Sequence, residues 1–138
     1  MKVNLGFYTG LLAQLEAETL GAEAALARID EAFRLSSAVE HRCSLPFLYR
    51  LRGEFLLKRN PADPVPAEEA FQTSIAIAKE QGARSPVLLA SLAVAKLYQS
   101  TARPIEAHAV LAPALEGFAP TPEMPEIAEA MSLSARLA

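Results

Sequence analysis

A helical stripe of small and apolar residues recurs along this chain at intervals of about forty residues, and this repeat limits the fold more than any other feature. In PAEEAFQTSIAIAKEQGARSP, at residues 66–86, the stripe residues are spaced three and one apart, which places them on one helix face. The three stripes begin at Ala25, Ala67 and Ala107. The sequence therefore contains an internal repeat.

A second apolar helix is predicted before each stripe. These first helices span about residues 3–19, 45–58 and 86–101. One pair of helices buries too little surface to be stable alone, so we expect the pairs to stack. Small residues let helix backbones approach closely, and they stand at matching places beside bulky residues of the stripes: Ala13, Gly53 and Ala95 beside Ile29, Phe71 and Leu111.

Proline and glycine residues predict where the helices begin and end. Pro66 is expected in a first helical turn, and Gly82 as a left-handed residue that ends the same helix. Ser85 is expected to cap the next helix. Two proline-rich segments are predicted to be loops, KRNPADPVP and APTPEMPE. A final helix is predicted after the second loop, near residues 123–137. Pro113 is expected to kink or open the helix that contains it.

Composition narrows the function classes. With 51% hydrophobic residues, 21% charged residues and a net charge of −3, the chain lacks the basic character of nucleic-acid-binding proteins. Alanine and leucine favour helix, and no alternation of β-branched residues predicts strands. The single cysteine, Cys43, allows no internal disulfide, and the apolar run at residues 85–95 is too short to span a bilayer. We expect a cytoplasmic protein that binds neither nucleic acid nor membranes.

The repeated positions resemble those of the tetratricopeptide repeat (TPR) family, which places small residues at three positions of a helix hairpin and a bulky residue in its second helix. YRLRGEFLL…AEEAFQTSIAIA carries the pattern through Gly53, Ala67, Phe71 and Ser74. LAVAKLY…EAHAVLAPAL carries it through the set Ala95, Tyr98, Ala107, Leu111 and Ala114. The first pair carries a weaker version, with Ala13, Ala25, Ile29 and Ala32.

This resemblance implies a fold. The expected fold is all-α, a right-handed α-solenoid of three TPR-like helix hairpins plus a C-terminal capping helix, in a single domain at residues 1–138. The repeats would span about residues 3–40, 45–82 and 86–118, and the capping helix about 123–137.

More narrowly, residues 45–118 resemble the carboxy-terminal repeat region of large bacterial signalling proteins. Those proteins join a nucleotide cyclase or a DNA-binding domain to an ATPase module and then to such repeats. Three segments carry this likeness: LYRLRGEFLL, AFQTSIAIAKEQGARSPVLLASLAVAKLY and VLAPALEGF. The chain itself has no GxxxxGK[ST] phosphate loop, so the resemblance implies a regulatory end in signal transduction and no catalysis here.

TPR proteins bind peptides along a concave side lined by their first helices, and the resemblance implies such a groove here. The lining positions, carried over residue by residue, mix apolar and charged side chains: Phe7, Leu11, Gln14 and Glu18, then Phe47, Arg50, Leu51, Glu54 and Lys58, then Leu89, Leu92, Lys96 and Gln99. An alternative stays open, in which Phe7, Leu51 and Leu92 are core residues. Arg50 and Glu54 would then only form an ion pair four residues apart.

Residue types that carry catalysis or bind metals occur without the necessary spacing. His41 and Cys43 lie close together, and His108 lies in the third repeat, but no CxxC or HxxxH pattern joins them. The carboxylates stand where a solvated helix face or a helix start accounts for them. We therefore expect no enzyme, no cofactor and no metal site.

Three functional hypotheses follow. The first is a protein-interaction module that binds a peptide or a partner helix. The second is a structural element that forms a homodimer, because the first helix lacks a clear cap and an open apolar face there would be covered by a second copy. The third is a small-ligand binder or an enzyme with an unrecognised pocket.

Exchanging Ala67 or Ala107 for leucine should overpack the joint between two helices. We expect each substitution to lower the free energy of unfolding by about 1–3 kcal/mol. Chemical denaturation measures this loss. An unchanged unfolding midpoint would mean that no helix backbone approaches these alanines.

Overall fold

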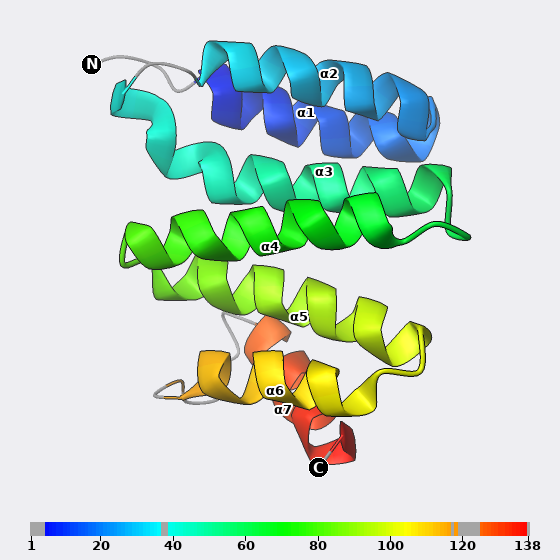
Figure 1. Ribbon diagram of the computed structural model, residues 1–138. Coiled ribbons are helices and arrows are strands. Elements are labelled where there is room, and N and C mark those ends of the chain that lie inside the picture. Colours follow the sequence, from blue (N-terminus) through cyan, green and yellow to red (C-terminus); the bar gives the residue numbers. More distant parts are fainter. Residues whose placement is uncertain (1–4, 37–38, 117, 119–124, 138) are drawn as a thin grey trace.

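The computed structural model of the protein describes residues 5–36, 39–116, 118 and 125–137, apart from the side chains of residues 39–41. All regular structure within these residues is helical (Figure 1). The helices in this part of the chain are α1 (Leu5–Thr19), α2 (Ala22–Leu35), the 3₁₀ helix η1 (Val39–Ser44), α3 (Leu45–Arg59), α4 (Val65–Glu80), α5 (Arg84–Ser100), α6 (Pro104–Leu115) and α7 (Pro125–Leu137). The predicted all-α fold class is confirmed.

The helices follow one another along one direction (Figure 1). Each α-helix packs on the next, from α1 on α2 to α6 on α7. In addition, α1 contacts α3, and α3 contacts α5. The α1–α2 pair lies at one end of this arrangement and the α6–α7 pair at the other.

The predicted first helices correspond to α1, α3 and α5. The start of α5 differs from the prediction, because this helix begins at Arg84 and not after Ser85. Its N-cap residue is Ala83, which is extended and makes no capping hydrogen bond through its side chain. The prediction that Ser85 caps α5 is therefore wrong. The reason is that the turn after α4 leaves Ala83 in an extended conformation, so α5 begins at the next residue, Arg84.

The small residues at the predicted joints are buried as expected. The set Ala13, Ala25, Ala67, Ala95 and Ala107 is 0% exposed, and Ile29, Phe71 and Leu111 are at most 2% exposed. Gly53 of α3 lies against the Phe71 ring of α4. A Cβ atom at Gly53 would be 2.5 Å from Phe71 Cε1, a separation that real Cβ atoms do not show. The joint between α3 and α4 therefore requires glycine.

A second close approach joins α1 to α3. A Cβ atom at Gly10 would lie 2.7 Å from Leu48 Cδ2 and 2.9 Å from Phe47 Cε2. Between α3 and α4, Ser74 Oγ donates a buried hydrogen bond of 2.6 Å to the Pro46 carbonyl oxygen. Small residues thus set the spacing between helix pairs as well as within them.

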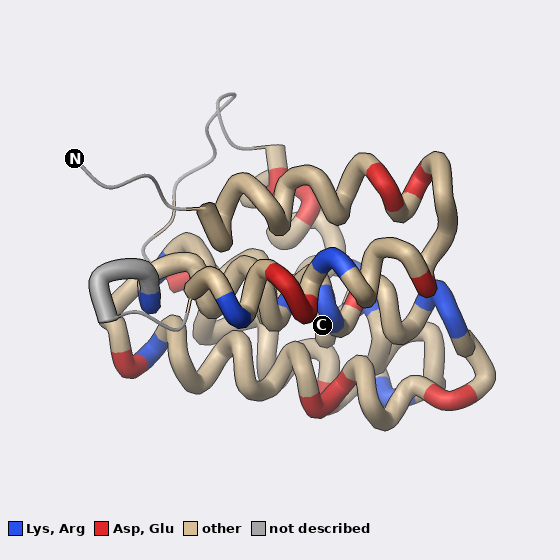
Figure 2. The backbone as a smooth tube through the Cα atoms, turned by 90° about the horizontal axis from the view of Figure 1, so that it is seen from above, with Lys and Arg blue, Asp and Glu red and all other residues tan. Residues whose placement is uncertain are grey.

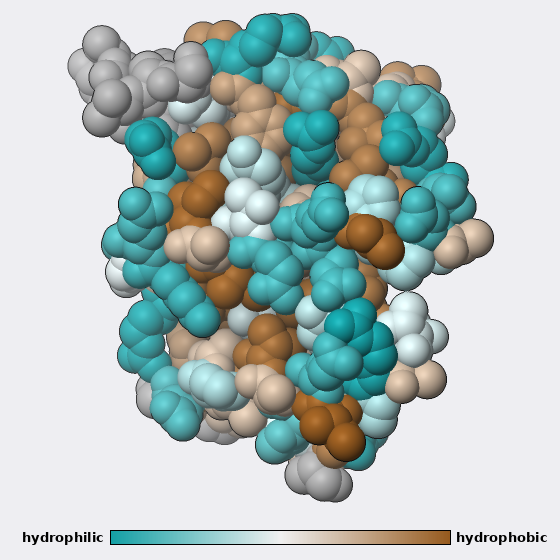
Figure 3. Space-filling model, in the orientation of Figure 1, coloured by the Kyte–Doolittle hydropathy of each residue, from teal (hydrophilic) through white to brown (hydrophobic). Residues whose placement is uncertain are grey.

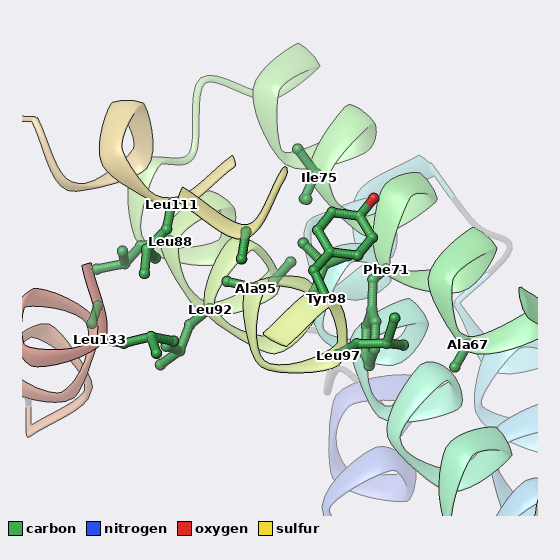
Figure 4. Close-up of a cluster of buried hydrophobic side chains, with 14 of the residues drawn as sticks. Ala67, Phe71, Ile75, Leu88, Leu92, Ala95, Leu97, Tyr98, Leu111 and Leu133 are labelled. Carbon is green, nitrogen blue, oxygen red and sulfur yellow. The ribbon is translucent and has the colours of Figure 1, made fainter. Parts of the chain in front are cut away.

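The buried side chains form two apolar clusters. One cluster joins α1, α2 and α3 and includes Ala13, Ile29 and Leu48. The other extends from α4 to α7 (Figure 4). In it, Leu133 of α7 packs in the same cluster as Leu88 of α5. The last helix therefore covers apolar surface of the pair before it.

Pro113 lies inside α6 and is exposed, and the residues on both sides of it are helical as far as Leu115. Because α6 ends two residues after Pro113, the missing N–H of this proline removes a backbone hydrogen bond only from the last helical turn.

The turn after α4 is a Schellman motif, as the predicted left-handed glycine requires. The Ala83 N–H donates to the Ala78 carbonyl oxygen at 2.9 Å, and the Gly82 N–H to that of Lys79 at 3.0 Å. Gly82 has a φ of 68°. This prediction is confirmed.

The turn after α5 repeats the motif without a glycine. The Arg103 N–H donates to the Tyr98 carbonyl oxygen at 2.7 Å, and Ala102 takes the left-handed position with a φ of 59°. An alanine in this conformation is strained because its Cβ atom approaches the following carbonyl group.

Replacing Ala102 with glycine should stabilise the protein. Relief of the strain is worth about 1–2 kcal/mol, and the greater freedom of glycine in the unfolded chain offsets part of it, which leaves a gain of about 1 kcal/mol. The matched exchange Gly82→Ala should cost a similar amount. Urea denaturation of both variants measures the effects, and a destabilised Ala102→Gly chain would contradict the left-handed turn.

Candidate functional site

Two neighbouring hollows lie along the odd-numbered helices. The larger, of about 390 Å³, is bounded by α3, α5 and α7, with Leu57, Leu89 and Leu92 among its apolar lining residues. The smaller, of about 230 Å³, lies between α1, η1, α3 and α5, where Phe7 and Phe47 line it. Both hollows share the side chains of Arg50 and Leu89. We call the two together the odd-helix groove.

Several of the expected lining residues meet in this groove: Phe7, Phe47, Arg50, Glu54, Leu89 and Lys96. Gln14, Lys58 and Gln99 do not line it. Lys58 instead donates a hydrogen bond of 2.6 Å to the carbonyl oxygen of Ala17, at the last turn of α1. A lysine there complements the negative end of a helix, so its role is structural.

The remaining expected lining positions divide between groove and core. Leu92 lines the groove although it is only 4% exposed. Leu51 is completely buried and belongs to the core, as the alternative reading proposed. Leu11 and Glu18 of α1 are exposed but line neither hollow. Phe7 is 37% exposed and is therefore not a core residue.

The charges of the groove are arranged in pairs. Arg50 Nη1 lies 3.2 Å from Glu54 Oε1, so the predicted pair four residues apart is present. The Arg50 guanidinium also lies over the Phe47 ring, 5.6 Å from its centroid. Lys96 of α5 pairs with Glu129 of α7. Each cation of the groove thus has an anionic partner that can be exchanged for one on a bound molecule.

The sequence reading missed the contribution of α7 to this groove. Glu126 and Glu129 line the larger hollow, whereas the carboxylates were expected only to serve solvated helix faces or helix starts. Nothing local marks their role, because it depends on how α7 packs on helices earlier in the chain.

A second groove lies on the even-numbered helices α4 and α6. These helices are on the near side of the ribbon in Figure 1, and Figure 3 shows the surface of the molecule from the same direction. A hollow of about 440 Å³ is lined by Gln72 and Ile75 of α4, by residues of α5, and by Val110 of α6. An adjoining hollow of about 270 Å³ shares Lys79 and Pro113 with it. We call these the even-helix groove. The sequence analysis did not identify it, because the expected lining positions came only from the first helix of each pair.

A polar network closes one end of the even-helix groove. The Tyr98 hydroxyl donates to Glu68 Oε1 at 2.7 Å and accepts from Gln72 Nε2 at 3.0 Å. Arg103 Nη1 donates to Glu68 Oε2 at 3.1 Å, and its guanidinium lies 4.1 Å from the centroid of the Tyr98 ring. Arg103 also binds Glu106, which lowers the pKa of that carboxyl group. The network joins α4, α5 and α6.

The candidate metal or catalytic residues are not brought together. Cys43 is exposed at the rim of the smaller odd-helix hollow, and His108 is half-buried on α6. The side chain of His41 lies outside the described residues. Across the described part of the chain, no three His, Cys, Asp or Glu side chains are grouped so that they could hold a metal ion.

Comparison with known proteins returned no matching family model, no matching curated protein and no matching solved structure. Among the described helices, none combines the length and apolar character needed to cross a membrane.

Burial raises the pKa of the Tyr98 phenol, and its hydrogen bond to Glu68 raises it further. The folded chain therefore holds this proton at a pH where unfolded tyrosine, with a pKa of about 10, has lost it. The contribution to stability is present below that pH and is lost as the pH rises through the folded pKa.

We expect an alkaline ultraviolet titration to show one of the three tyrosines ionising later than the others. Tyr98→Phe should remove this late step, whereas Tyr8→Phe, at a residue that is 59% exposed, should keep it. A late step that survives Tyr98→Phe would contradict the assignment.

Proposed function

We propose that this chain is a non-catalytic protein-interaction module that binds a peptide or a partner helix in the odd-helix groove. The observation that carries this proposal is that residues selected from the repeat positions of the sequence line two contiguous hollows, with Arg50 and Leu89 common to both. Arg50 lies on α3 and Leu89 on α5, so two of the expected first helices contribute to the same surface.

We further propose that the helix pairs α1–α2, α3–α4 and α5–α6 are TPR-like hairpins of a right-handed solenoid, with α7 as the capping helix. Two features support this. Consecutive pairs pack through α2 on α3 and α4 on α5, and the first helices contact one another. The joint between Gly53 and Phe71 combines a small and a bulky residue at the positions where TPR hairpins have them.

The chemistry of the groove fits an amphipathic peptide. Apolar side chains of a peptide can pack on Leu57, Leu89 and Leu92. The ion pairs of Arg50 and Lys96 supply both positive and negative groups beside this apolar surface. Recognition of a peptide helix needs such a combination of apolar contact and flanking polar groups.

The cellular role that fits this reading is the regulatory end of a bacterial signalling assembly in the cytoplasm. Its support is the likeness of residues 45–118 to the repeat regions of such proteins. A homodimer is the alternative function, and a feature of α1 favours it, as described below.

A peptide selected from a random phage-displayed library tests the groove. We expect Leu89→Gln and Lys96→Glu each to weaken binding of that peptide at least tenfold, which corresponds to about 1.4 kcal/mol. Fluorescence anisotropy of the labelled peptide measures the affinity, and the thermal midpoint of each variant checks that the fold is retained.

Lys79→Glu is the matched control, because Lys79 is exposed on α4 and lines the even-helix groove. It should leave the affinity unchanged. Loss of binding in Lys79→Glu, with full binding in both groove variants, would move the site to the other side of the molecule and contradict the proposal.

A further inference from the structure

Helix α1 carries its small residues inside and its large apolar residues outside. Its buried residues are Gly6, Gly10, Ala13 and Ala17. The opposite face carries Leu5, Tyr8, Leu12 and Leu15, whose exposed fractions are 53%, 59%, 43% and 63%. We call these four residues the outer face of α1. A surface helix normally shows the reverse pattern, with polar residues outside.

The two ends of the fold differ in this respect. At the α6–α7 end, Ile127, Ala130 and Leu133 of α7 are buried against the core. At the other end, no described residue covers the outer face of α1, as its exposed fractions show. In stacked helix pairs, an apolar helix face of this kind packs against a neighbouring surface, and no described residue supplies one here.

We propose that a second copy of this chain covers the outer face of α1, forming a two-fold symmetric dimer in which the two α1 helices lie antiparallel. This proposal does not depend on the odd-helix groove.

The spacing of the outer face fits two-fold symmetry. Its residues are separated by three, four and three positions, so the stripe reads the same in both directions about position 10. When two such helices run antiparallel, Leu5 meets Leu15 of the second copy and Tyr8 meets Leu12. In a symmetric dimer each contact is made twice, and this stripe supplies that self-complementarity.

The charge pattern also fits a second copy. The described part of α1 carries no charged residue before Glu16 (Figure 2). Two copies of this face therefore meet without repulsion between like charges. In the antiparallel arrangement, the acidic end of α1 lies beside the amino-terminal end of the other α1, where the helix dipole favours negative charge.

The outer face and the adjoining Leu11 place five large apolar side chains, each 37–63% exposed, on one side of α1. A dimer that buries them on both copies approaches the size of about 1,000 Å² at which specific interfaces begin. A polar rim flanks this area, because Glu16 of α1 pairs with Arg28 of α2 at 2.9 Å, and Arg28 pairs with Glu31 at 2.8 Å. An apolar centre with a polar rim is the usual anatomy of an interface.

Light scattering after size exclusion tests the dimer. At about 50 μM, we expect the unmodified chain to show twice the mass of one chain, and Leu12→Glu to show the mass of one chain with an unchanged helical circular dichroism spectrum. Ile105→Glu is the matched control. Ile105 is 84% exposed on α6, and its replacement should leave the dimer intact.

Two further measurements serve if Leu12→Glu fails to fold. The thermal midpoint of the unmodified chain should rise with its concentration. In a Cys43→Ser background, a mixture of Tyr8→Cys and Leu12→Cys chains should form disulfides faster than either variant alone. An unmodified chain that stays monomeric, a dimer that survives a folded Leu12→Glu, or faster self-linking of the single variants would each overturn the proposal.

Discussion

The close approach of α3 and α4 at Gly53 is the contact on which the rest of the structure depends. The Phe71 ring occupies the space where any other residue at position 53 would have a Cβ atom. With its ring 2% exposed, Phe71 joins the larger apolar cluster that continues into α5, α6 and α7. A wider separation at this point would leave a gap under Phe71, and native cores do not tolerate such voids without loss of stability.

The same packing determines what the surface presents. Because the Gly53 face of α3 is turned to α4, the neighbouring face with Phe47, Arg50 and Glu54 is available to line the odd-helix groove. In α1, small residues on the inner side leave the large apolar residues on the outer side. Both proposed binding surfaces are therefore consequences of where glycine and alanine lie in the helices.

Much of the fold follows from the sequence, and the reasons are local. Helical periodicity identifies the buried face of α2, α4 and α6, as Ile29, Phe71 and Leu111 show. Gly82 ends α4 because only glycine takes a left-handed φ without strain. Ala102 adopts nearly the same left-handed conformation, and the sequence does not predict this because alanine rarely has a positive φ. The N-cap of α5 was misplaced for a related reason, since the preceding turn and not Ser85 sets that boundary.

The candidate site follows from the sequence only in part. Repeat positions identified the side of α3 and α5 that lines the odd-helix groove, because equivalent residues of stacked pairs fall on one side. They did not identify the wall formed by Glu126 and Glu129, nor the hydrogen bond from Lys58 to α1. These contacts depend on how helices distant in sequence pack, and that information is not carried by the period of any one helix.

The most direct test of the central claim is the proton magnetic resonance of Gly53. If its backbone lies against the Phe71 ring, the two Hα protons should show nuclear Overhauser contacts to the ring protons and ring-current shifts away from ordinary glycine values. Hα protons at ordinary shifts, with no contact to an aromatic ring in the folded chain, would contradict the close joint and the arrangement of helix pairs built on it.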